Sequence, residues 1–175
     1  HINMIRGDKM KKKIWLLVLF TFLLVGCQMG NTPTSKVEAL FGKYPKVDSD
    51  ISLGIDNVLK EQNLTEAHQQ RYRKLLENQY KNLTYEIKDE LIDGDKATVL
   101  TEIEVTDYKK AISDLSFDSS IYTKESYDEE KLNRLEKAKD KVKYTLEIKL
   151  TKDSDGNWKV DALSLEQMKK IQGMY

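Results

Sequence analysis

The sequence predicts an α+β fold in which a four-stranded antiparallel sheet, built from two long hairpins, packs against helices. Apolar residues recur at helical spacing over residues 35–81 and then alternate with period two over residues 83–105. An Asp-Gly pair divides the alternating region, and a second Asp-Gly pair at 155–156 follows another alternating run at 142–150. Helices followed by hairpins, with more helix between them, are the order of an α+β domain.

Three helices are predicted before the first hairpin. Residues 35–38 read Ser-Lys-Val-Glu, which has the form of a capping box, and apolar residues follow at helical spacing up to Pro45. A second helix is expected over residues 50–61, and Thr65 is expected to cap a third that extends to about Lys81. The apolar stripe of this third helix carries one histidine among aromatic and aliphatic residues: His68, Tyr72, Leu75, Leu76 and Tyr80.

The first hairpin has its turn at Asp93-Gly94 and one face that we expect to be buried. That face carries Leu83, Tyr85, Ile87, Ala97, Val99, Thr101, Ile103 and Val105. A short helix over residues 108–115 and a loop over 116–124 are expected next. A second box, Ser-Tyr-Asp-Glu at 126–129, predicts the start of a charged outer helix whose narrow apolar stripe is Leu132, Leu135 and Ala138.

The second hairpin consists of a long strand, the Asp155-Gly156 turn and a returning strand. The buried face is predicted to carry Val142, Tyr144, Leu146, Ile148, Leu150, Trp158 and Val160. Ser164 then caps a last short helix that ends at Gly173, with Leu165, Met168 and Ile171 on its apolar face.

This order of elements resembles the cystatin-like and NTF2-like folds. Within that group the chain is similar to small lipoproteins of unknown function from Gram-positive bacteria. The residues that carry the resemblance are the runs at 34–38, 79–87, 93–97 and 156–160, which read TSKVE, QYKNLTYEI, DGDKA and GNWKV. These motifs are structural, so the resemblance implies a fold and not an activity.

The first 26 residues read as a leader. Lys11, Lys12 and Lys13 precede an apolar run at 14–25, which at ~1.5 Å per residue is too short to cross a ~30 Å hydrocarbon core. That layout is typical of a secretory signal peptide, which we assign to residues 10–26, with residues 1–9 as a translated upstream region. Residues 27–34 are polar and small, and we expect a tether there, followed by one domain at 35–175.

The leader ends in Leu24-Val25-Gly26-Cys27, which resembles the lipobox of bacterial lipoproteins. Cys27 is the single cysteine of the chain, so it has no partner for an internal disulfide. The resemblance implies that Cys27 carries a diacylglyceryl anchor and becomes the mature N-terminus. Because two acyl chains hold a protein stably on a bilayer, we expect the mature protein on the extracytoplasmic face of the cell membrane.

The charge of the mature chain excludes some partners. The whole chain has 29 basic and 29 acidic residues, and residues 1–26 contain five of the basic and one of the acidic ones, which leaves a net charge of about −4. Nucleic-acid binding needs clustered Lys and Arg, so we expect no nucleic-acid partner. The expected partners are the membrane, through the anchor, and an envelope protein or small ligand.

Four tyrosines are candidates for the lining of a ligand pocket between the helices and the concave face of the sheet. They are Tyr72, Tyr80, Tyr85 and Tyr144. The alternative is that their rings fill the core and their hydroxyls reach its rim.

No catalytic residue, metal site or cofactor is predicted. His68, the only histidine outside the leader, lacks a nucleophile motif, and we expect it to be partly exposed without a role. Residues 153–157 read as a turn and not as a calcium loop, since the EF-hand glutamate is missing. Asp89, Glu90, Asp93 and Asp95 are expected to form a solvated acidic edge.

The sequence therefore predicts a membrane-anchored, non-enzymatic binding or interaction module of the cell envelope. Two alternatives stay open. One is a carrier of a small apolar ligand beneath the curved sheet, and the other is an enzyme that uses carboxylates and tyrosines in that pocket.

Overall fold

The alternating runs of the sequence form one antiparallel sheet. In the computed structural model, which describes residues 30–175, the strands lie in the order β1-β2-β3-β4. They are β1 (Thr84–Asp93), β2 (Lys96–Thr106), β3 (Lys141–Lys152) and β4 (Trp158–Val160). Gly94 and Gly156 occupy the two turns at φ 60° and 81°, a region that favours glycine. The predicted α+β class and both hairpins are confirmed.

The central strands have one buried and one solvated face. On β2 every second residue from Ala97 to Val105 is buried, and on β3 the buried residues are Leu146, Ile148 and Leu150. The register pairs Val99 with Ile148 and Ile103 with Tyr144, so the apolar residues of the two strands share one face. The other face consists mainly of Thr, Lys and Glu side chains.

The edge strand β1 departs from the predicted alternation. Its register shifts between Ile87 and Asp89, and beyond this bulge Glu90 lies opposite Val99, on the inner face. The Glu90 carboxylate accepts hydrogen bonds from the backbone N–H and the hydroxyl of Thr34, at 2.9 and 3.0 Å. Glu90 therefore joins the sheet edge to the first helix and is not part of a freely solvated edge.

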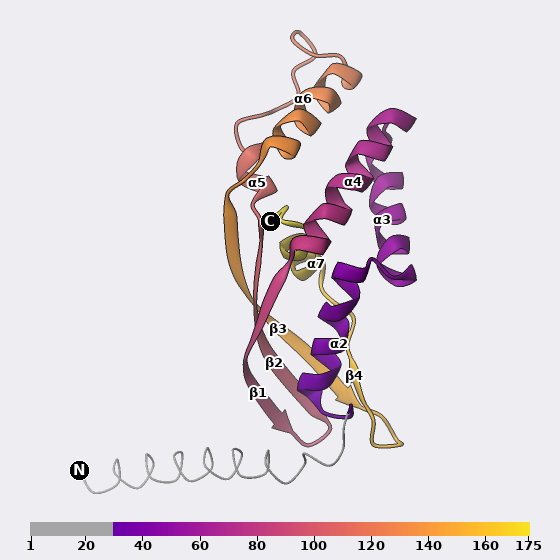
Figure 1. Cartoon of the computed structure of the whole chain (residues 1–175), viewed down its shortest axis with the longest axis vertical. Coiled ribbons are helices and arrows are strands. Elements are labelled where there is room, and N and C mark those ends of the chain that lie inside the picture. Colours follow the sequence, from indigo (N-terminus) through magenta and orange to yellow (C-terminus); the bar gives the residue numbers. More distant parts are fainter. Residues whose placement is uncertain (1–29) are drawn as a thin grey trace, which may run out of the picture.

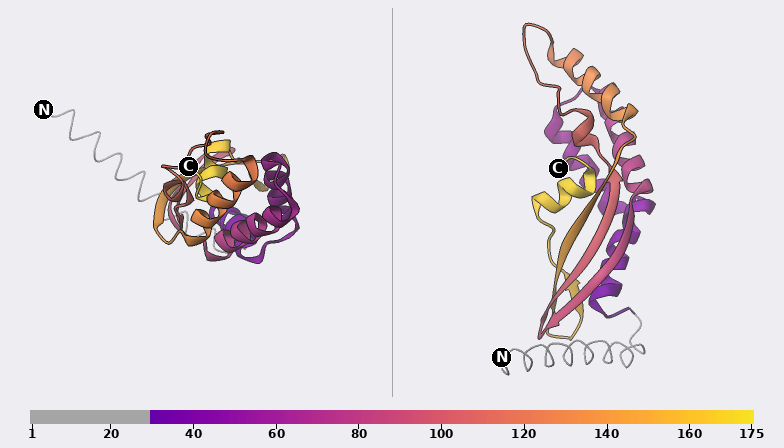
Figure 2. Two further views of the ribbon diagram at one scale, coloured as in Figure 1. Left: turned by 90° about the horizontal axis from the view of Figure 1, so that it is seen from above. Right: turned by 90° about the vertical axis from the view of Figure 1, so that its left-hand side faces the viewer.

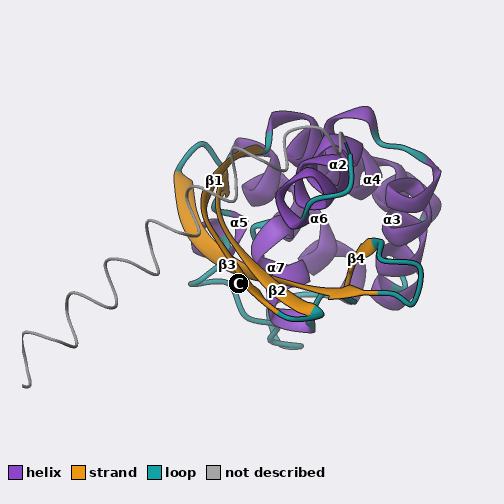
Figure 3. Cartoon of the chain, turned by 90° about the horizontal axis from the view of Figure 1, so that it is seen from below, coloured by secondary structure: helices purple, strands orange, loops and turns teal. Residues whose placement is uncertain are grey.

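The helices cover the inner face of the sheet (Figure 3). They are α2 (Pro33–Lys46), α3 (Ser49–Gln62), α4 (Glu66–Asn82), α5 (Tyr108–Ala111), α6 (Lys124–Lys137) and α7 (Leu165–Gln172). Helices α3 and α4 run side by side, α6 lies along α4, and the short α7 lies near the middle of the domain (Figure 1). Figure 2 shows that the domain is elongated, with both hairpin turns at the end where the described chain begins.

Side chains from α2 and α4 fill the space beneath the sheet. Val37, Phe41 and Leu76 are at most 1% exposed, as are Ile103 and Ile148 on the strands. These side chains belong to one hydrophobic core. Of the two possibilities left open for this space, a ligand pocket or a filled core, the burial of these residues agrees with a filled core.

Two helices begin one turn earlier than predicted. Thr32 caps α2 and Thr123 caps α6, and in each case the serine of the predicted box, Ser35 or Ser126, is the third residue of the helix. The serine hydroxyl accepts from the backbone N–H of the threonine, at 2.9 Å in α2 and 3.0 Å in α6. Serine thus does here what glutamate does in the usual capping box.

The other helices follow the prediction with small shifts. Helices α3, α4 and α7 begin and end within one residue of their predicted limits, with caps at Thr65, Ser164 and Gly173 as expected. Helix α2 continues through Pro45 to Lys46, and α5 is a single turn that ends at Ala111. In α7 only Ile171 is buried, because Leu165 and Met168 are 66% and 40% exposed.

The described part of the segment where we expect a tether, residues 30–34, contacts the domain. The Asn31 amide donates to the carbonyl of Gly156 at 3.1 Å and accepts from the N–H of Trp158 at 3.0 Å, and α2 begins at Pro33. The chain is therefore fixed to the β3–β4 turn from Asn31 onward. The upstream region, the signal peptide and the lipobox with Cys27 lie outside the described residues.

Candidate functional site

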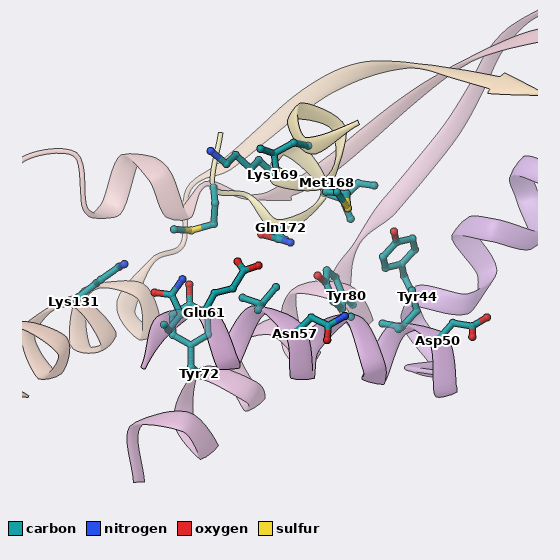
Figure 4. Close-up of a pocket in the computed structure, with 17 residues that line it drawn as sticks. Tyr44, Asp50, Asn57, Glu61, Tyr72, Tyr80, Lys131, Met168, Lys169 and Gln172 are labelled. Carbon is teal, nitrogen blue, oxygen red and sulfur yellow. The ribbon is translucent and has the colours of Figure 1, made fainter. Parts of the chain in front are cut away.

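A groove of about 600 Å³ lies between α3, α4 and α7 (Figure 4). Its volume is in the range of small-molecule sites, which is roughly 300–1,000 Å³. The lining comes from three helices, from Lys131 of α6 and from the ends of α2 and of the chain, and no residue of the four strands contributes. The site is therefore a cleft between helices and not a cavity of the sheet.

The lining combines apolar and polar side chains. The apolar ones are Ile51, Val58, Leu165, Met168, Ile171 and Met174. The polar and charged ones are Asp50, Asn57, Glu61, Gln62, Lys131, Lys169 and Gln172, and three tyrosines, Tyr44, Tyr72 and Tyr80, complete the wall with Gly54. The residues of α3 recur every three or four positions because one face of the helix borders the groove.

The tyrosines present neutral hydroxyls to the groove. Burial raises the pKa of Tyr44 to about 12 and also raises the pKa values of Tyr72 and Tyr80. The rings of Tyr44 and Tyr80 pack edge to face with centroids 5.1 Å apart. Because these phenols stay protonated at neutral pH, they can both donate and accept hydrogen bonds toward a molecule in the groove.

Helix α7 is held in place by a buried amide. Gln79 of α4 is 1% exposed and donates from Nε2 to the carbonyls of Thr106, at 2.8 Å, and Gln172, at 3.1 Å. Its Oε1 accepts from the N–H of Thr106 at 2.9 Å. Gly173 ends α7 at φ 73°, directly against Thr106 and Gln79. This joint fixes one wall of the groove to the helix that forms another.

Two of the four predicted tyrosines line the groove and two lie elsewhere. Tyr72 and Tyr80 are in its wall. Tyr85 is 38% exposed on the edge strand, where its ring stacks on Phe41 at 5.3 Å and borders a shallow hollow of about 160 Å³. Tyr144 packs near the chain end, with its ring 5.8 Å from that of Tyr175.

His68 is buried, in contrast to the expectation of partial exposure. It is 6% exposed at the interface of α4 and α6, and its Nε2 lies 2.7 Å from a carboxylate oxygen of Glu129. Arg71 donates to the same oxygen at 2.6 Å and to Glu136 at 2.6 and 2.9 Å. The hydrogen bond from His68, and then that from Arg71, lowers the pKa of Glu129.

The His68 cluster joins two helices and is separate from the groove. Neither His68 nor Glu129 belongs to the groove lining. The Nδ1 of His68 is buried and has no hydrogen-bond partner among the described residues. These contacts give the histidine and carboxylate a role in holding α6 against α4.

The acidic turn at residues 153–157 is explained by hydrogen bonds of its own chain. Asp153 accepts at 2.9 Å from the backbone N–H of both Asp155 and Asn157. Within residues 30–175 no three His, Cys, Asp or Glu side chains are grouped so that they could hold a metal ion. None of the helices within residues 30–175 combines the length and the apolar character needed to cross a bilayer.

Comparisons with protein families, with curated proteins and with solved structures found no match to this chain.

The residues that the sequence did not reveal belong mainly to α3, α6 and α7. Lys131 borders the stripe of Leu132 and Leu135, but a lysine at the edge of a stripe is ordinary for a surface helix. Asn57 and Glu61 lie on one face of α3. That spacing indicates a groove wall only when another helix is known to face it. The placement of α7 opposite α3 depends on Gln79, and nothing in its sequence neighbourhood predicts that contact.

Proposed function

We propose that this protein is a lipid-anchored protein of the bacterial cell envelope whose domain binds an elongated, largely apolar molecule in the groove between α3, α4 and α7. The observation that carries the proposal is the groove itself, at about 600 Å³, whose walls combine methionines and aliphatic residues with tyrosines and other polar side chains. In sites for small molecules, apolar walls supply contact area and polar groups fix the orientation of the ligand.

Binding in the groove can be tested by substituting Gly54, a glycine in its wall. A Cβ at Gly54 would have nothing within 4 Å, so Gly54→Phe places a ring in the groove without straining the helix. Gly42 of α2 has the same freedom but does not line the groove, which makes Gly42→Phe a matched control.

The measurement is the fluorescence of N-phenylnaphthylamine, an uncharged reporter of apolar sites. We expect the unaltered protein and Gly42→Phe to bind it equally, and Gly54→Phe to bind at least about tenfold more weakly, since the new ring occupies the site. Equal binding by Gly54→Phe, or no binding by the unaltered protein, would reject the groove as a ligand site.

The anchor is proposed from the lipobox at 24–27. Three peptide units separate Cys27 from Gly30, and they span at most about 11 Å. With Cys27 lipidated, the domain end that holds Asn31 and the hairpin turns stands next to the bilayer. Replacing Cys27 with Ala should move the protein from the membrane fraction to the soluble fraction, and continued membrane association would rule the anchor out.

We also propose that the domain is of the cystatin-like or NTF2-like type. The consecutive order of four antiparallel strands, with helices over one face, supports the assignment. An experimental structure with another strand order would reject it.

A further inference from the structure

Lys131 is a half-buried cation in the groove wall. It lies on α6 and lines the groove, yet no carboxylate oxygen of residues 30–175 lies within 4.0 Å of its Nζ. On the same helix Lys124 contacts Asp128, and Arg134 contacts Glu130 and Asp114. Lys137 has no such contact within residues 30–175 either, but its side chain is exposed. Lys131 therefore stands out as a cation that loses part of its hydration without gaining a partner.

The electrostatics of this position agree with the geometry. Burial lowers the pKa of Lys131, and this effect outweighs the stabilisation from Asp128. Lys109 and Lys124 add to the lowering. The charged ammonium is thus destabilised where it stands, so an anion that enters the groove would find a desolvated partner.

The groove has two different ends. Lys131 lies beside Tyr72 at one end, whereas Asp50 lies beside Tyr44 at the other (Figure 4). Asp50 is already paired with Lys43 at 3.3 Å. Glu61 of α3 lies near Tyr72, and Lys169 of α7 lies on the facing wall (Figure 4). Asp50, Glu61 and Lys169 are exposed, so Lys131 is the one charged residue of the lining that is half-buried.

The dimensions of the groove suit a long molecule. Its lining follows α3 from Asp50 to Gln62, which is roughly 18 Å at ~1.5 Å per residue. The walls also carry Met168, Met174 and Val58. Methionine adapts to flexible apolar chains because its side chain is unbranched and polarisable.

From these observations we propose that the groove binds an anionic amphiphile, an elongated apolar molecule with one carboxylate or phosphate group that pairs with the ammonium of Lys131 while Tyr72 donates a hydrogen bond to it. The inference rests on the proposed function of the groove and specifies the chemistry of its ligand. Charge complementarity at one end and apolar walls along the length fix the direction in which the ligand lies.

The test compares ligands with one alkyl chain and different head groups. Laurate, dodecyl phosphate, dodecanol and dodecylamine are titrated calorimetrically, below micelle-forming concentrations, into the whole chain carrying Cys27→Ala so that no acyl anchor competes. We expect laurate and dodecyl phosphate to bind at least about tenfold more tightly than dodecanol, and dodecylamine to bind most weakly. A preference between laurate and dodecyl phosphate identifies the head group.

Variants of Lys131 distinguish the effect of its charge on ligand affinity from the effect of its packing. Lys131→Met keeps the length of the side chain and should reduce the affinity for laurate to that for dodecanol, whereas Lys131→Arg should restore it. Lys137→Met, on the same helix but outside the groove lining, should leave all four affinities unchanged.

The results can show that the anionic head group is wrong without showing that the groove is not a ligand site. If laurate and dodecanol bind equally, or if Lys131→Met weakens both to the same extent, the anionic head group is excluded and the groove remains an apolar site. If none of the four ligands binds and N-phenylnaphthylamine does not bind either, the ligand site itself is excluded.

Discussion

Thr101 places a hydroxyl in the middle of the apolar inner face of the sheet. Its side chain is 0% exposed, lies opposite Leu146 of β3, and its Oγ1 has no hydrogen-bond partner among the described residues. A buried hydroxyl without a partner costs about 1–3 kcal/mol. Because valine has the same shape, Thr101→Val should raise the free energy of unfolding by about 1 kcal/mol, measured as a higher urea midpoint at unchanged m.

A threonine on the other face of the sheet supplies the control. Thr145 of β3 is exposed, so Thr145→Val should change the free energy of unfolding by no more than about 0.5 kcal/mol. If Thr101→Val were destabilising while Thr145→Val was neutral, the hydroxyl of Thr101 would have a partner, such as a buried water, in solution.

At the scale of elements, the attachment of α7 depends on one glycine. Gly173 ends the helix at φ 73°, and a Cβ there would collide with the carbonyl oxygen of Thr106 and the side-chain amide of Gln79. Gly173→Ala should therefore cost about 3 kcal/mol or more, since it adds a backbone clash to the strain of a left-handed residue. It should also weaken N-phenylnaphthylamine binding, because α7 forms one wall of the groove.

Gly156 provides the matched comparison for this prediction. It has φ 81°, but a Cβ at this position would have nothing within 4 Å. Gly156→Ala should therefore cost only the strain of the backbone, about 1–2 kcal/mol, and leave reporter binding intact. Equal losses of stability in the two variants, measured by urea denaturation, would show that the joint of α7 with Gln79 is not rigid.

Sequence periodicity predicts those helices and strands whose type and limits are determined by their own residues. Helix α4 and strand β2 each carry a complete apolar pattern, so their types and limits follow from local sequence. The sequence predicts the starts of α2 and α6 one turn late, because Ser35 and Ser126 have the same capping chemistry as Thr32 and Thr123, which stand three residues earlier.

The candidate site could be predicted only in part, for a different reason. Tyr72 and Tyr80 belong to a helical stripe that the sequence displays, but which stripe faces which depends on contacts between distant segments. The bulge after Ile87 turns Glu90 inward, and no residue pattern in β1 predicts the bulge. Likewise the burial of Phe41 in the core and the position of the groove between helices both follow from how α2, α3, α4 and α7 pack together.

At the scale of the whole molecule, buried phenols make the fold sensitive to alkaline pH. Burial raises the pKa of Tyr44 and Tyr108 to about 12, from a usual 10.0, and also raises the pKa values of Tyr72 and Tyr80. Above pH 10 the unfolded chain loses protons that the folded chain retains, so the free energy of unfolding falls as pH rises. The loss is about 1 kcal/mol for each such tyrosine and pH unit.

Lys131 acts in the opposite direction but cannot offset this loss. Its pKa lies below the usual 10.5, so between these two values the unfolded chain binds more protons and stability rises with pH. The stabilisation from this one half-buried ammonium stops increasing near pH 10.5. The destabilisation from the four buried phenols begins near pH 10 and continues to increase above it. The melting temperature should therefore fall steeply above pH 10, with the tyrosinate absorbance of the four buried phenols appearing only as the chain unfolds. Tyr44→Phe should make this fall shallower, and a melting temperature that stayed level through this range would mean that the phenols are solvated.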